Sequence, residues 1–245
     1  MRESPYKLYS LKGTELAILL AAQKGESVHC FGIINGDETK EDYMYALDHM
    51  VKQGVVQANG EKIMINQPYR HMIDSMVAAN VALTVRTSDD ALNDYCLYPA
   101  GAEKALVLSM SSVRRGGVLM TELTYEELFD DYFPEGLLPD DRQDVAVTES
   151  VDYELFRPAL KMLREDRTID DVRLIIGVDA VNMRTLERKS MIVMDLPMGL
   201  YTVCYDGDDI MAEPYEQHVF KEGLKLMLNG EVFEDDNGND PFCNA

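Results

Sequence analysis

The strongest hydrophobic pattern of the chain runs over residues 39–66, where an amphipathic helix precedes a short hairpin. Thr39 is a favourable N-cap, and Asp42 three residues later stands where a capping box places its acid. Apolar residues recur at helical spacing and predict the buried face of this helix. That face consists of Tyr43, Ala46, Leu47, Met50 and Val51. Gly54 suits the position just after the helix, where a left-handed backbone is favoured.

Two short apolar runs, 55–56 and 63–65, predict the hairpin, with Asn59-Gly60 as its tight turn. An earlier helix is predicted with Thr14 as its N-cap and Gly25 at its end. Its inward residues are Leu16, Leu19 and Leu20. The apolar run 28–31 predicts a small strand beside the hairpin. Together these elements predict a winged-helix-like module at the N-terminus.

The charge of this module does not suit nucleic acid. Residues 1–80 hold eight Lys and Arg residues against ten acids, whereas phosphate binding needs an excess of positive charge. The whole chain has 23 basic and 44 acidic residues, a net charge of −21 and a pI near 4.4. Such a balance disfavours nucleic acid and anionic membrane surfaces, and it favours a basic or amphipathic protein partner.

The rest of the chain alternates groups of strands with helices. Strands are predicted over 81–86, 94–99, 104–109, 118–123, 172–178, 189–196, 200–205 and 208–213. Helices are predicted over 68–79, from Thr124 to about residue 133, and from Pro214 to Gly230. Segregated helices and strands indicate an α+β fold: an N-terminal winged-helix-like module followed by two antiparallel-sheet/helix units.

Four segments follow from these elements: 1–80 is the winged-helix-like module, and 81–134 is the first antiparallel sheet with its helix. Residues 135–149 form an acidic loop or linker, and 150–245 hold the second sheet, its flanking helices and an acidic tail. The stretch 122–154 has twelve acids and one base, and its centre reads as an exposed loop. The tail from Glu231 is expected to be frayed.

Catalytic spacing is missing from the sequence. Its four histidines are far apart, and none belongs to an H-E-x-x-H motif. No nucleophile elbow or phosphate-binding loop occurs. Residues 235–240 resemble the start of a calcium loop but lack the glycine at its sixth position. We therefore predict no catalytic, cofactor-binding or metal-binding residue, and no enzyme.

One anion contact is a candidate. Arg114 and Arg115 lie beside glycines between two predicted strands, where their guanidinium groups could hold a phosphate or carboxylate. The alternative is that both arginines are simply solvated, as arginines in such loops usually are.

The expected compartment is the cytoplasm. Four scattered cysteines without a C-x-x-C pair indicate reduced thiols. No apolar run approaches the roughly 20 residues that span a bilayer, and the N-terminus lacks the apolar core of a secretory signal. We expect no membrane contact.

The two predicted sheet units are preceded by three elements. These are a helix with the sequence LKGTELAILL, a linker, and the segment KEDYMYALDHMVKQGVV. This layout resembles that of the EspG-type chaperones associated with ESX (type VII) secretion, whose N-terminus is similarly helical and whose body has two sheet-containing halves. The resemblance covers most of the chain as architecture and implies a chaperone-like role. No diagnostic residue accompanies it, so no binding residue is assigned.

Three classes of function remain open. The charge and the absence of catalytic spacing favour a cytosolic adaptor or chaperone-like protein that binds another protein, with a homodimer also allowed. The alternative is a winged-helix transcriptional regulator whose C-terminal half senses a ligand or dimerises. An enzyme whose site is assembled from distant residues has the least support.

Overall fold

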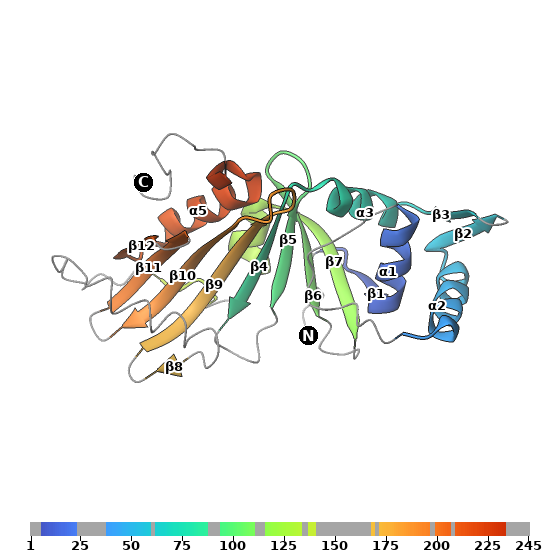
Figure 1. Cartoon of the computed structure of the whole chain (residues 1–245), viewed down its shortest axis with the longest axis horizontal. Helices are drawn as coiled ribbons and strands as arrows, with labels where there is room; N and C mark the ends of the chain where they lie inside the picture. The colour runs from blue at the N-terminus through green and yellow to red at the C-terminus, as the bar shows by residue number, and fades with distance from the viewer. Residues whose placement is uncertain are drawn as a thin grey trace. The chain divides into compact units, whose positions relative to one another are not determined.

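Antiparallel strands and separate helices make up the chain in the computed structural model, which confirms the predicted α+β class (Figure 1). The structure describes residues 6–23, 38–59, 62–87, 94–110, 116–133, 137–140, 168–169, 172–196, 199–206 and 209–233. Two compact units are formed, each from separate stretches of sequence. The first unit comprises Met1–Ala79 and Tyr95–Thr124, and the second comprises Asn80–Asp94 and Tyr125–Ala245. Each unit thus takes residues from more than one of the four segments expected from the sequence.

The sheet of the first unit contains four strands in the order β1-β7-β6-β5, all antiparallel to their neighbours. Their bounds are β1 Tyr9–Lys12, β5 Tyr95–Pro99, β6 Lys104–Met110 and β7 Gly117–Thr124. The strands expected over 94–99, 104–109 and 118–123 are thereby confirmed. The same unit contains helices α1 (Gly13–Ala22), α2 (Lys40–Lys52) and α3 (Tyr69–Ala78), and the hairpin of β2 (Val56–Asn59) and β3 (Lys62–Ile65).

Helix α1 begins and ends earlier than the sequence indicates. Its N-cap is Lys12, whose backbone N–H donates to the Glu15 carboxylate at 2.7 Å, so the prediction of Thr14 as the cap is wrong. The physical reason is that the Glu15 side chain reaches back to the N-cap, as the acid of a capping box does. The three leucines predicted to face inward are buried.

Helix α2 and the hairpin follow the predicted pattern closely. The Thr39 hydroxyl accepts from the Asp42 N–H, and the Asp42 carboxylate accepts from the Thr39 N–H at 2.9 Å, which confirms the capping box. Gly54 has the predicted positive φ, at +69°. The hairpin pairs Asn59 with Lys62, and Gly60 of the turn expected at Asn59-Gly60 lies outside the described residues. The strand expected over 28–31 lies outside the described residues.

The sheet of the second unit has the order β4-β9-β10-β11-β12, again antiparallel, and β8 pairs with β9. The bounds are β4 Val81–Thr87, β8 Thr168–Ile169, β9 Val172–Asn182, β10 Arg188–Leu196, β11 Gly199–Asp206 and β12 Asp209–Pro214. The four strands predicted near the C-terminus are confirmed.

Helix α5 (Gln217–Asn229) packs on β4 and β9 of this sheet (Figure 1). Its buried face consists of Phe220, Gly223, Leu224, Met227 and Leu228. The prediction that Pro214 opens this helix is wrong, because Pro214 is the last residue of β12 and pairs with Tyr201. A 3₁₀ turn, η2 (Glu231–Phe233), follows α5 and buries Val232, so the start of the acidic tail is packed rather than frayed.

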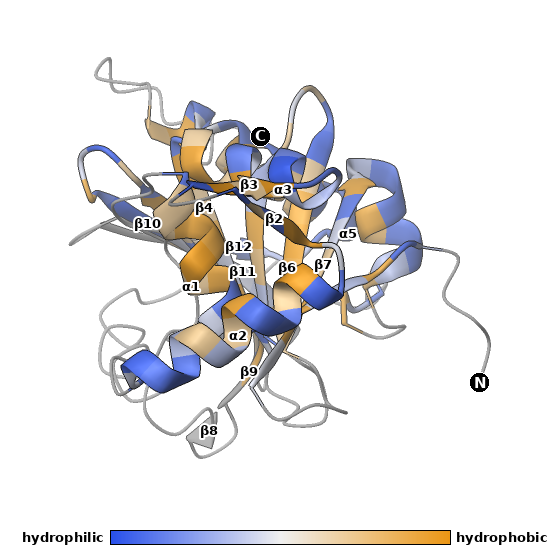
Figure 2. Cartoon of the chain, turned by 90° about the vertical axis from the view of Figure 1, so that its right-hand side faces the viewer, coloured by the Kyte–Doolittle hydropathy of each residue, from blue (hydrophilic) through white to orange (hydrophobic). Residues whose placement is uncertain are grey.

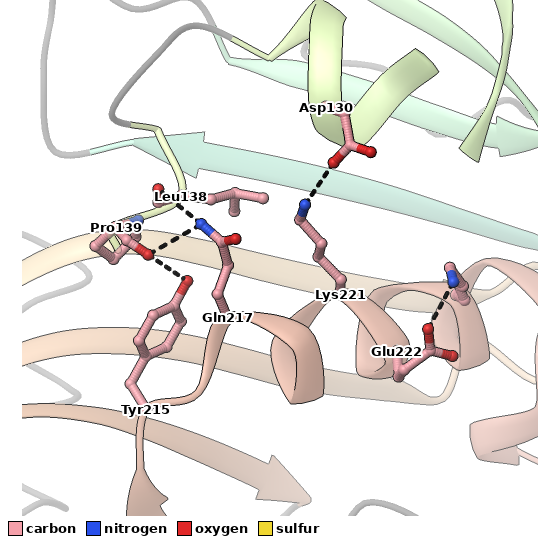
Figure 3. Close-up of polar contacts among 8 residues, drawn as sticks. Asp130, Leu138, Pro139, Tyr215, Gln217, Lys221 and Glu222 are labelled. Carbon is pink, nitrogen blue, oxygen red and sulfur yellow. Dashed lines mark hydrogen bonds and ion pairs between the residues drawn. The ribbon is translucent and has the colours of Figure 1, made fainter. Parts of the chain in front are cut away.

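Part of the expected acidic loop is buried in the second unit, beside the π-helical turn η1 (Glu127–Tyr132) that takes the place of the helix expected after Thr124. Leu137 and Leu138 are 2% and 8% exposed. Figure 3 shows the Tyr215 hydroxyl donating to the Pro139 carbonyl at 3.0 Å and the Gln217 amide donating to the same oxygen at 3.2 Å. The prediction of an exposed loop is therefore wrong at 137–139, where two leucines interrupt the acids. Residues 141–149 lie outside the described part of the chain.

Replacing Gly230 with alanine should lower the free energy of unfolding by about 1–2 kcal/mol, because an L residue is strained at its φ of +79°. An added Cβ would also lie 3.0 Å from Cγ2 of Val81. Gly54→Ala is the matched control, since Gly54 has a φ of +69° and open space around the added Cβ. Urea unfolding should show the larger loss for Gly230→Ala; equal losses would contradict close packing of Gly230 against β4.

Candidate interaction surface

Exposed apolar side chains gather on α2 and the neighbouring hairpin. Seven large apolar residues are exposed in the described part of the chain, and four of them lie on these two elements. The four are Met44 (60% exposed), Tyr45 (67%), Val51 (43%) and Met64 (49%). Because soluble surfaces usually carry such residues singly, this concentration marks the elements as a candidate contact region. Figure 2 shows apolar residues interspersed with polar ones along α2.

An apolar stripe runs along α2, in which Met44 and Val51 are exposed and Leu47 between them is half-buried. Met44, Leu47 and Val51 are separated by three and four positions, so they share one helical face. Ala46 and Met50 are buried on the opposite side, where α2 packs on α1. The prediction that Val51 faces inward is wrong, because neighbouring residues on a helix point about 100° apart and Met50 occupies the inward position. We call Met44, Tyr45, Leu47, Asp48 and Val51 the α2 surface.

Charged groups border this surface. The Asp48 carboxylate lies 2.5 Å from Nζ of Lys52, and both side chains are mostly exposed. Asp48 raises the pKa of Lys52 through this contact. Lys12 places its Nζ 5.5 Å from the ring centroid of Tyr45. Because an exposed ion pair contributes little to stability, the Asp48 carboxylate is available to another cation at small cost.

A buried carboxylate fixes α2 against α1. The Glu15 side chain is 3% exposed, and its Oε1 lies 2.7 Å from Nδ1 of His49 on α2. Its Oε2 accepts the backbone N–H of Lys12 at 2.7 Å, so both oxygens have partners. His49 is therefore held by a carboxylate within the fold. The sequence offers Glu15 only as a first-turn acid, and nothing local reveals its partner 34 residues away.

The capping box of α2 predicts a pH dependence. Hydrogen bonds from the Thr39 hydroxyl and N–H lower the pKa of Asp42 from its usual 3.8. A lowered folded-state pKa stabilises the fold above the unfolded value, and the contribution is lost as pH falls through the folded value. Wild type should therefore resist urea better than Asp42→Asn at about pH 7, and the difference should vanish near pH 2. A difference that persists in acid would contradict the role of the carboxylate.

A polar cluster in the second unit is satisfied internally. Asp179 on β9 accepts a hydrogen bond from the Ser190 hydroxyl at 2.5 Å and pairs through its other oxygen with Arg86. The three residues come from adjacent strands, as cross-strand polar partners do. Since both oxygens of Asp179 are engaged, the cluster resembles a structural network more than a general base with its nucleophile. No local sequence pattern links the three residues, because they lie far apart in the chain.

The other predicted features give no reactive site. Arg114 and Arg115 lie outside the described residues, as do His29 and residues 235–240. His71 pairs with Glu122 at 2.9 Å. Within the ranges that the structure describes, no group of three or more His, Cys, Asp or Glu side chains could hold a metal ion. Cys96 and Cys204 are not in disulfides.

The described helices include none that is both long enough and apolar enough to cross a bilayer. No protein-family model matches the chain, and no curated protein matches it significantly.

Proposed function

We propose that this protein is a cytoplasmic adaptor or chaperone-like protein that binds another polypeptide through the α2 surface. The resemblance of its layout to the EspG-type chaperones supports the proposal of a role associated with type VII secretion. The observation that carries the proposal is the apolar stripe on the outer side of a helix whose inner side is buried through Ala46 and Met50. Met44 and Val51 are 60% and 43% exposed, whereas Met50 on the other side of the helix is fully buried.

The stripe offers enough apolar area to contribute to recognition. Fully burying a Val or Met side chain stabilises a complex by roughly 1.5–3 kcal/mol before the cost of association is subtracted. Tyr45 adds an aromatic side chain of the kind that dominates interface energetics. Met64 on the hairpin supplies a further apolar contact, and methionine adapts its shape to different partners.

The charge of the chain supports a protein partner over nucleic acid. Helix α2 carries two lysines against three acids, and the whole chain has a net charge of −21. Such a field attracts basic surfaces and repels phosphates. The proposal includes no catalytic role, because the polar clusters of the described residues are engaged within the fold.

Co-expression with the proteins encoded by neighbouring genes tests this function. A complex should form with wild type and should be lost in Met44→Glu/Val51→Glu. The matched control is Val77→Glu/Leu186→Glu, which changes two other exposed apolar residues, 38% and 72% exposed, in the same way. Loss of the complex in both double variants, or no complex with wild type, would count against the proposal.

A winged-helix transcriptional regulator is the second candidate, with a C-terminal half that senses a ligand or dimerises. The observation that favours it is the order of α2 and the β2–β3 hairpin, which is that of a recognition helix and its wing. Such a regulator would bind duplex DNA with strong salt dependence. Fluorescence polarisation with a labelled duplex at about 50 mM salt distinguishes the two: salt-sensitive binding would favour the regulator, and its absence would favour the adaptor.

A further inference from the structure

The spacing of the α2 surface is that of a helix seam. Met44, Leu47 and Val51 occupy the a, d and a positions of a heptad, the pattern that one helix presents to another. Strand pairing would instead need a free sheet edge or alternating side chains, and α2 provides neither. The observed stripe therefore fits a partner helix that lies along α2.

The two flanks of this seam differ. Asp48 follows Met44 by four positions and Glu41 precedes it by three, so both acids occupy the e flank, and both are exposed. The g flank is formed by Tyr43 and Met50, of which Met50 is fully buried. A partner helix therefore meets one open flank, and that flank is acidic. Flanking charges of this kind select the partner of a helix.

We propose that the partner element is a basic amphipathic helix, whose apolar face covers the seam and whose Lys or Arg residues pair with Glu41 and Asp48. This inference rests on the proposed function. A second copy of this chain fits less well, because an antiparallel copy would place acidic flank against acidic flank. Each copy also has a net charge of −21, which opposes association.

Two synthetic helical peptides of about three heptads test the proposal, with an identical leucine seam and either lysines or glutamates on the flank. Fluorescence polarisation at about 50 mM salt should show wild type binding the lysine peptide at least about tenfold more tightly. Glu41→Lys/Asp48→Lys should reverse this preference. Met44→Glu/Val51→Glu should bind neither peptide, and circular dichroism should show that every variant keeps its helical content.

Three results would overturn the inference. Wild type could bind neither peptide, it could bind both equally, or the charge-reversed variant could keep the wild-type preference. Sedimentation velocity adds a fourth: a wild-type dimer that Met44→Glu/Val51→Glu abolishes would assign the seam to a second copy. If a neighbouring gene product still depends on Met44 and Val51 when the peptides fail, the proposed function stands and only the basic helix is excluded. If neither the peptides nor a neighbouring gene product binds through Met44 and Val51, the proposed function is excluded as well.

Discussion

Phe220→Ala should lower the free energy of unfolding by about 3–5 kcal/mol, because it removes a fully buried ring from the face of α5 that packs on the sheet. The ring lies 5.9 Å from that of Tyr215, whose hydroxyl donates to the Pro139 carbonyl. The cavity would thus weaken the contact that holds residues 137–139. Urea unfolding followed by far-UV circular dichroism measures the loss.

The control for this prediction is Glu222→Ala, two positions along the same helix. Its side chain is exposed and pairs only with Lys225 among the ion pairs described for it. Surface changes of this kind usually alter stability by less than about 0.5 kcal/mol. If Phe220→Ala were no more destabilising than this control, the packing of α5 on β4 and β9 would be contradicted.

Glu15→Ala should lower the free energy of unfolding by about 2–3 kcal/mol, since it removes both the cap of α1 and the buried partner of His49. Hydrogen exchange should accelerate in α2, because α2 loses its polar anchor to α1. Glu15→Gln is the control: its amide oxygen can still accept from the Lys12 N–H, as Gln does in a capping box.

The two substitutions separate anchoring from general destabilisation. Glu15→Gln should retain more than half of the free energy of unfolding that Glu15→Ala loses. Amide hydrogen exchange in α2 should stay slow in Glu15→Gln. Should α2 amides exchange at the wild-type rate in Glu15→Ala, the helix would be held by apolar contacts alone. The buried carboxylate would then have no part in presenting the α2 surface.

Local features of the fold were predictable from the sequence. Three of them depend only on residues close together in the chain: the capping box of Thr39 and Asp42, the glycine after α2, and the alternating strands. Their sequence patterns can therefore be recognised without knowing the tertiary structure. The same holds for Gly230, which ends α5 in a left-handed conformation as predicted.

Features that depend on distant partners were not predictable. Strand β4 pairs with β9, and Val85 lies opposite Val178, although strands β5, β6 and β7 of the first unit lie between them in the sequence. Alternation predicts that each is a strand but not which strand it joins. Leu137 and Leu138 were assigned to an exposed loop because the acids around them dominated the composition of the segment.

The candidate surface was predicted only in part. Periodicity identified α2 as amphipathic, but it placed Val51 on the buried side. The choice between Met50 and Val51 depends on the position of α1, since the two side chains differ by only about 100° around the helix. Glu15 and His49, which fix that position, belong to different helices and carry no shared sequence signal.

Site-specific photo-crosslinking tests the central claim most directly. A benzoylphenylalanine placed at Met44, on the α2 surface, should crosslink the co-expressed protein that forms the complex, and the same group at Glu222 on α5 should not. Mass spectrometry of the product should locate the crosslink in a helix of the partner that carries Lys or Arg beside its apolar face. Crosslinking from Glu222 but not from Met44 would show that the partner binds elsewhere and would contradict the account.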